Sequence, residues 1–250
     1  MLTDPLFYLA AIPAVLIVGI SKGGFGGSLG MIAVPMLTLV VASPVAAAIM
    51  LPILFAMDMQ ALWRFRQHFD KRNLQILLPA ATLGIAIGAL TFQHLSENHL
   101  KLIIGITSLL FCGNAVLQEL RKQVPAPREP HIGRGTFWGT LAGFTSFSIH
   151  AGGPPLSFYL LPQRLDKTVF VTTSIIFFAC VNGLKLIPYT LLGLFTGSNL
   201  LTSLVLMPLA IAGVRLGARL HHVLDATLFY RLCYVFLFIV GLKLTAEVLI

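Results

Sequence analysis

The stretch that decides the fold is SKGGFGGSLGMIAVP, Ser21–Pro35, because the chain repeats it as SIHAGGPPLSFYLLP, Ser148–Pro162. When the two stretches are aligned on their final proline, Gly26 falls on Gly153, at a spacing of 127 residues. Two further segments, LPAATLGIAIGAL from residue 78 and MPLAIAGVRLGAR from residue 207, share a proline and two glycines at a spacing of 129 residues. The chain is therefore an internal duplication with two halves of similar length.

The composition indicates an all-α protein of the lipid bilayer. Hydrophobic residues make up 57% of the chain and charged residues only 10%, with a mean hydropathy of +0.89, whereas a soluble domain has about 25% charged residues. Apolar stretches such as 74–92 and 228–242 approach the roughly 20 residues that a spanning helix needs, and the alternating pattern of a membrane barrel is absent. The first stretch, Leu6–Ile20, has no basic residue before it and no small-residue cleavage site after it, which favours a mature helix over a signal peptide.

The net charge of +8 is explained by basic loops, which in membrane proteins face the cytoplasm. This explanation replaces nucleic-acid binding, the usual interpretation of such a charge in a soluble protein. The intervening turns at 42–44, 93–101 and 195–199 are poor in positive charge, so both termini are expected on the outer side. Of the 17 Lys and Arg residues, 13 lie in or around four loops: Arg64, Arg66, Lys71 and Arg72; Arg121, Lys122, Arg128 and Arg134; Arg164 and Lys167; Arg215, Arg219 and Arg231.

The loop charge reverses between the two halves. The loop 63–73 is basic and its counterpart 191–199 is not, whereas the turn 93–101 is near neutral and its counterpart 221–231 is basic. If every basic loop faces the cytoplasm, the two halves cross the membrane in opposite directions, which requires an odd number of crossings in each half. The sequence therefore predicts an inverted-topology repeat, an arrangement used mainly by secondary transporters.

Each half is predicted to be a Gly-broken helical hairpin followed by three transmembrane helices. The hairpin arms of the second half are too short to cross about 30 Å of hydrocarbon; tilted helices and a re-entrant pair both stay open, and we favour ten helical segments with wholly or partly re-entrant arms. The repeats are 1–120 and 135–250, joined by a cytoplasmic linker, 121–134. The expected segments are Leu6–Ile20, Met31–Val41, Pro44–Leu62, Leu74–Phe92 and Lys101–Leu117, then Thr136–Ile149, Pro155–Pro162, Thr168–Leu191, Leu200–Leu216 and Thr227–Leu249.

Two glycine-rich turns, 22–28 and 150–155, interrupt the hairpins. Unwound backbone at membrane depth is costly unless it is buried in protein or lines a cavity, and glycine permits left-handed backbone and a close approach to a ligand. A helix that restarts after such a break presents free N–H donors and a partial positive charge, which suits an anion. The alternative is that the glycines only allow tight helix packing. Two breaks at equivalent positions, with Lys22 beside one and His150 in the other, favour a binding site.

Three polar residues lie deep in predicted spans: Asp58 in the first half, and Asn182 and Lys185 in the matching span of the second half. Ionisable groups at this depth are expensive and are functional candidates by default. Asp58 and Lys185 fall on near-equivalent repeat positions and could pair, either within a functional site or as a structural ion pair, while Asn182 fits a hydrogen bond between helices. His150 either carries a coupling proton, since histidine titrates near neutral pH, or is a structural residue.

The sequence carries no motif of an enzyme, a metal site or a cofactor site, because P-loop, nucleophile-elbow, HExxH and CxxC patterns are absent. Cys112, Cys180 and Cys233 are odd in number and lie in apolar segments, which favours small buried hydrophobic side chains over disulfides or metal ligands. We therefore expect neither catalysis nor a cofactor. A membrane-embedded enzyme, the alternative class, would need a convergent catalytic set beyond Asp58 and His150.

The chain resembles the sulfite exporter TauE/SafE family of bacterial membrane proteins, also called the toluene sulfonate uptake permease family, from about Ile12 to the end. The resemblance rests on GISKGGFGGSLGMIAVPML, LPILFAMDMQALWRFR, LPAATLGIAIGA, HAGGPPLSFYLL and ACVNGLKLIPYTLLG. It implies inner-membrane transport of sulfur-containing anions such as sulfite, sulfoacetate or other sulfonates, a class rather than a single compound. By position, it also implies that this chain matches the family's breaks at Gly23, Gly24, Gly26, Gly152, Gly153 and Pro154, and its polar span positions at Asp58, Asn182 and Lys185.

The prediction is thus a secondary transporter of the bacterial inner membrane, with export favoured; an anion channel and a transporter of another small carboxylate or oxyanion are the alternatives. A small anion would lie near the midplane between the two breaks and move as one repeat rocks against the other. Direction, coupling to protons or sodium ions, and oligomeric state stay open. The candidate coupling residues are Asp58 and His150. The candidate substrate-binding residues are Ser21, Lys22, Gly23, Gly24, Gly26, Gly27, Ser28, His150, Gly152, Gly153, Pro154, Ser157, Asn182 and Lys185.

Overall fold

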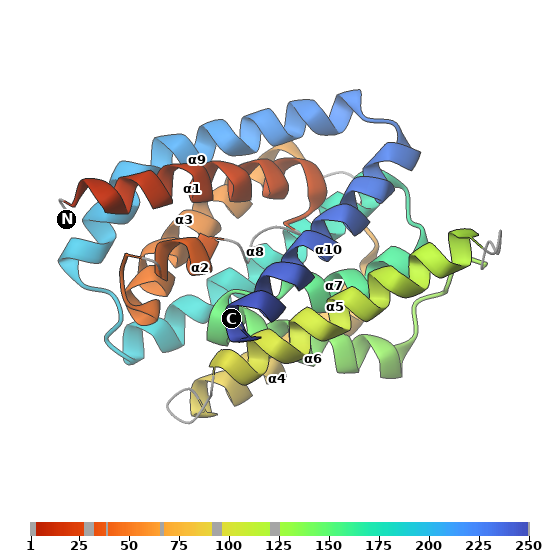
Figure 1. Ribbon diagram of the computed structural model, residues 1–250, viewed down its shortest axis with the longest axis horizontal. Coiled ribbons are helices and arrows are strands. Elements are labelled where there is room, and N and C mark those ends of the chain that lie inside the picture. Colours follow the sequence, from red (N-terminus) through yellow and green to blue (C-terminus); the bar gives the residue numbers. More distant parts are fainter. Residues whose placement is uncertain are drawn as a thin grey trace.

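The computed structural model describes residues 4–27, 33–38, 40–65, 68–91, 97–120 and 126–249, and these ranges contain helices and no strands (Figure 1). The all-α prediction is confirmed. The elements are α1 (Pro5–Phe25), α2 (Ala33–Thr38), α3 (Ser43–Arg64), α4 (Lys71–Thr91), α5 (Glu97–Leu120), α6 (Ile132–Ile149), α7 (Gly153–Leu160), the 3-10 turn η3 (Leu161–Gln163), α8 (Lys167–Leu191), α9 (Gly197–Val223) and α10 (Ala226–Leu249).

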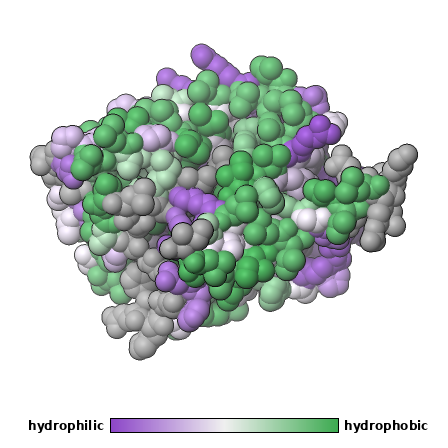
Figure 2. Space-filling view, in the orientation of Figure 1, coloured by the Kyte–Doolittle hydropathy of each residue, from purple (hydrophilic) through white to green (hydrophobic). Residues whose placement is uncertain are grey.

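Six of the described helices, α1, α3, α4, α8, α9 and α10, are long and apolar enough to cross a membrane. The helix α5 adds a shorter apolar segment, Lys101–Leu117. Large hydrophobic side chains such as Leu90, Leu110 and Leu204 are more than half exposed, and Figure 2 shows hydrophobic residues over much of the visible face. A surface of this kind requires lipid around it, so the chain is a multi-pass membrane protein.

Contacts between the helices follow the sequence repeat. The first helix, α1, packs along α9, and its counterpart α6 packs along α4. Figure 1 shows α1 and α9 side by side along one edge, and α5 running beside α10, the last helix of the other half. The pairs α1–α9 and α6–α4 are related to each other as a two-fold relation between the halves would require. The opposed orientation of the halves in the membrane stays a prediction.

Glycines allow the close approach of α1 to α9 and of α4 to α6. A Cβ atom added to Gly23 in α1 would lie 2.1 Å from the carbonyl oxygen of Val214 in α9, and one added to Gly84 in α4 would lie 2.0 Å from that of Thr140 in α6. Both distances are far below van der Waals contact, so the backbones meet with no room for a side chain. Small residues at the contact are the common means of packing helices in membranes.

The two ends of the second half's hairpin, α6 with α7 and η3, lie close together. The backbone N–H of Arg128, before α6, donates to the carbonyl oxygen of Pro162 in η3 at 3.0 Å. The N–H of His131, the N-cap of α6, also reaches the hydroxyl of Tyr159 in α7 at 3.3 Å. With only eight residues in α7, these contacts agree with the re-entrant arrangement, which stays a prediction.

Several expected boundaries need correction. Helix α1 runs to Phe25, so the predicted break at 22–28 begins at Gly26 and not at Lys22. Helix α9 continues past Leu216 to Val223 and takes part of a predicted basic loop into the helix. The expectation of three buried cysteines is also wrong at one position: Cys112 and Cys233 are buried, but Cys180 on α8 is exposed.

Candidate functional site

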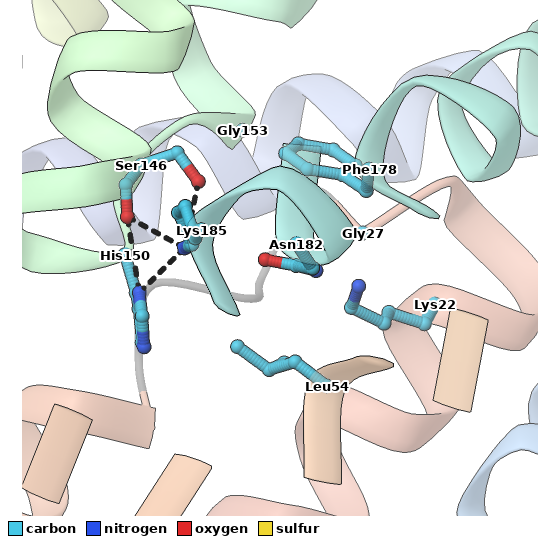
Figure 3. Close-up of a pocket in the computed structure, with 9 residues that line it drawn as sticks. All are labelled: Lys22, Gly27, Leu54, Ser146, His150, Gly153, Phe178, Asn182 and Lys185. Carbon is cyan, nitrogen blue, oxygen red and sulfur yellow. Dashed lines mark hydrogen bonds between the residues drawn. The ribbon is translucent and has the colours of Figure 1, made fainter. Parts of the chain in front are cut away.

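A small cavity lies where the two glycine-rich turns meet the middle of α8 (Figure 3). Its volume of about 20 Å³ is little more than the roughly 10–15 Å³ that one water molecule needs. The polar side chains around it are almost wholly buried. The lining residues are Lys22, Gly27, Leu54, Ser146, His150, Gly153, Phe178, Asn182 and Lys185.

On one side of the cavity, Lys22 forms a buried salt bridge with Asp58. The amide nitrogen of Asn182 donates to the other carboxylate oxygen of Asp58 at 2.6 Å. The Lys22 ammonium also lies 5.3 Å from the ring centre of Phe178, within cation–π range. Three helices, α1, α3 and α8, are therefore joined through one carboxylate. The predicted contact of Asn182 between helices is present, with Asp58 as its partner.

On the other side, Lys185 makes its hydrogen bonds to the end of α6. Its ammonium donates to the carbonyl oxygen of Ser146 at 2.8 Å, to the Ser146 hydroxyl at 3.1 Å and to Nδ1 of His150 at 2.9 Å. The anticipated pairing of Lys185 with Asp58 is wrong, because Asp58 binds Lys22 and Asn182 instead. In Figure 3, Lys22 and Lys185 lie on opposite sides of the cavity with Asn182 between them.

The hydrogen bonds of His150 select one tautomer. Its Nε2 faces the carbonyl oxygen of Ala47 on α3 at 3.2 Å, and a carbonyl only accepts, so Nε2 carries the proton. Its Nδ1 faces the ammonium of Lys185, which only donates, so Nδ1 accepts. The carbonyl of Ser146, 3.0 Å from Nδ1, accepts a hydrogen bond from the ammonium of Lys185. A neutral imidazole satisfies this arrangement.

The two breaks end their helices in the same way. Gly26 after α1 and His150 after α6 both adopt left-handed backbone, with φ of 64° and 54°. The backbone N–H that follows each residue bonds to the carbonyl six positions earlier, Ser21 or Thr145, at 3.0 Å in both cases. The left-handed residue and the bond that follows it satisfy a carbonyl of the last turn in the same way at both helix C-termini. Lys22 and Ser146 each lie four residues before such a cap, so the caps place both side chains at the cavity.

The structure brings only some of the predicted site residues to the cavity. Lys22, Gly27, His150, Gly153, Asn182 and Lys185 line it, and Asp58 contacts it through its hydrogen bonds. Ser28 lies outside the described residues. The others are buried nearby without lining the cavity: Ser21, Gly23, Gly24, Gly26, Gly152, Pro154 and Ser157.

Gly23 and Gly24 have a different position from the one expected of unwound backbone. Both lie inside α1, where added Cβ atoms would meet the carbonyl oxygens of Val214 and Gly217 at 2.1 and 2.7 Å. The carbonyl of Gly24 accepts from Nδ1 of His221 at 3.2 Å. Tight packing of α1 on α9, the alternative left open by the sequence, accounts for these two glycines.

Sequence reasoning missed three lining residues: Leu54, Ser146 and Phe178. Each lies four positions before a residue that was singled out, namely Asp58, His150 and Asn182 respectively. Residues four apart in a helix lie on the same face, one turn above the other. Applying that spacing to the predicted polar residues is the signal that would have found all three.

A family model described as Sulfite exporter TauE/SafE matches residues 11–244. Comparisons with curated proteins and with solved structures find no match. The matched segment runs from within α1 to within α10 and contains every residue that lines the cavity. A match over nearly all of the 250 residues, together with the membrane-spanning helices, leads to one conclusion: the chain belongs to the sulfite exporter TauE/SafE family of membrane transporters.

Proposed function

We propose that this protein is a secondary transporter of small sulfur-containing anions, sulfite or organosulfonates, which bind in the cavity between α1, α6 and α8. The observation that carries the proposal is that two buried lysines, Lys22 and Lys185, line one small cavity, at which both glycine-broken helices end. Ionisable side chains at membrane depth face pathways or sites rather than lipid. The family membership supports sulfur oxyanions as the class of substrate.

The size of the cavity supports alternating access over an open channel. A space of about 20 Å³ is too small for an anion with three oxygen atoms around sulfur, and the residues that surround it are buried. Binding then requires the helices around the cavity to move apart. Because α1 and α6 pack on helices of the opposite half, a rocking of one half against the other would separate them at this point.

Export is the direction that the membrane potential favours. A negative interior drives an anion outward with about 2.3 kcal/mol per charge per 100 mV. No coupling ion is needed to move a monoanion down this gradient. Asp58 and His150, the candidate coupling residues, lie on the cavity or bond to its lining, where protonation of either would change the charge next to the anion.

Flux into proteoliposomes tests the proposal. Purified protein should take up radiolabelled sulfite and a sulfonate in a saturable way, with stimulation by the same anion on the opposite side. Lys185→Met should lower uptake at least about tenfold, because a charge-assisted hydrogen bond to the anion is lost. The matched control is Lys71→Met, which removes an exposed lysine at the start of α4 and should leave uptake unchanged.

Other outcomes separate the alternatives. Conductance that does not saturate and shows no trans-stimulation would assign the protein as an anion channel. Transport of cations with none of anions would overturn the proposal.

A further inference from the structure

Lys185 is a fully buried lysine whose hydrogen-bond acceptors are all neutral. Its side chain has no exposed surface, and it donates to a carbonyl, a hydroxyl and an imidazole nitrogen. In the described part of the chain, no carboxylate forms a salt bridge with it. Burying an ammonium without a counter-charge is strongly unfavourable, so the protonated form of Lys185 gains stability from any anion that enters the cavity.

Lys22, by contrast, already has its counter-charge. Asp58 pairs with it, Asn182 holds the second oxygen of that carboxylate, and Phe178 covers the ammonium. Both partners of the ion pair are at least 95% buried in their side chains. An anion that competed for Lys22 would leave Asp58 as a buried, unpaired carboxylate, a severe penalty.

The charges around the cavity therefore sum to a single positive charge. Lys22 and Asp58 cancel, His150 is neutral by its hydrogen bonds, and Asn182 is an uncharged donor. With both lysines protonated, only the charge of Lys185 is left uncompensated. A guest with one negative charge neutralises the cavity, whereas a guest with two leaves one negative charge buried.

We propose that the cavity selects oxyanions by charge: it takes a singly charged sulfonate or hydrogensulfite, bound through Lys185, and discriminates against dianions. This inference rests on the function proposed above and specifies the charge of the anions that are transported. Asp58 then determines which charge is selected, because it neutralises Lys22 and so lowers the net charge of the cavity without touching the anion.

Methanesulfonate and sulfate make a matched pair of probes, since both are tetrahedral at sulfur and differ by one negative charge at neutral pH. Their affinities for the purified full-length protein are measured by calorimetry or by ligand-dependent thermal stabilisation. Wild type should bind methanesulfonate at least about tenfold more tightly than sulfate. Lys185→Met should lose methanesulfonate binding by a similar factor, while Lys71→Met should not.

A charge swap gives the sharper test. Asp58→Asn frees the charge of Lys22 and raises the sum to two, so the preference should shift toward sulfate by at least about tenfold. The double variant Lys22→Met with Asp58→Asn restores a sum of one and should return to methanesulfonate. If Asp58→Asn does not fold, the double variant, which removes both charges of the Lys22–Asp58 pair and leaves neither residue without its partner, still tests the rule.

The outcomes distinguish this inference from the function on which it rests. Binding of neither anion by wild type counts against the proposed function. Wild type that binds sulfate as tightly as methanesulfonate, or a double variant that prefers sulfate, overturns the charge rule and leaves anion transport standing.

Discussion

The hydrogen bond of Asn182 should stabilise the protein more than an average hydrogen bond between membrane helices does. Interhelical hydrogen bonds in membranes are worth about 0.6 kcal/mol on average, but this one goes to a buried carboxylate at 2.6 Å. Hydrogen bonds to charged groups contribute about 1.5–3 kcal/mol, and an unsatisfied buried group costs a similar amount. Asn182 therefore stabilises the Lys22–Asp58 pair as well as the contact between α3 and α8.

Asn182→Ala should destabilise the protein by about 1–3 kcal/mol, because one oxygen of Asp58 loses its donor. Thermal unfolding in detergent measures the effect. Asn114→Ala on α5 is the matched control: Asn114 is an exposed helical asparagine and its replacement should have little effect. Equal unfolding temperatures for the two variants would contradict this account of Asn182.

At the scale of elements, the glycines inside α1 allow it to pack closely on α9, whereas the glycine-rich turn after α1 ends the helix at the cavity. Gly23 brings the backbone of α1 against that of α9, and the left-handed caps at Gly26 and His150 end two helices at the cavity. In a glycine-rich stretch the sequence cannot separate these roles, because helix packing and unwound backbone favour the same residue. Only the partner helix, α9, shows which glycines have a neighbour that excludes a side chain.

Gly23→Ala should cost about 1–3 kcal/mol or more, because its Cβ would lie 2.1 Å from the Val214 carbonyl and force the two helices apart. Gly113→Ala on α5 is the control, since no atom lies within 4 Å of its Cβ position. That change should stabilise the helix by up to about 1 kcal/mol. Thermal unfolding should move in opposite directions for the two variants; a shared direction would refute the packing argument.

At the scale of the whole molecule, the sequence was sufficient for the fold class and the membrane location. Hydropathy identifies spans well because lipid demands long apolar helices. The pairing of α1 with α9 and of α6 with α4 agrees with the repeat. The orientation of the two halves rests on the charge of the loops, and it is open to a direct test.

Cysteine labelling tests the orientation. In a background without Cys112, Cys180 and Cys233, Gly197→Cys at the start of α9 should react with a membrane-impermeant maleimide in intact cells, because its turn is poor in positive charge. Ala126→Cys, in the linker between the halves, should react only after the membrane is opened. Both positions are exposed. The reverse pattern would invert the predicted topology.

The site was harder to predict than the fold, and the reason is a shift of three residues. Aligning the glycines placed Asp58 opposite Lys185, but the helix caps correspond at Gly26 and His150, a spacing of 124 residues that places Asp58 opposite Asn182. Three residues are most of one helical turn. Both alternatives therefore point to the same face, and the sequence finds the correct helix and the correct face but not the partner.

Helix α8 carries Asn182 and Lys185 one turn apart, and each is tied to a different set of residues: Asn182 to Asp58 on α3, Lys185 to Ser146 and His150 at the end of α6. Because both side chains belong to one rigid helix, α8 cannot turn or slide away from one set without straining its bonds to the other. The hydrogen bonds of both sets should therefore break together, with α8 moving as one rigid unit. Half-released states are then disfavoured, and the cavity opens in an all-or-none step, as is characteristic of bistable packed elements.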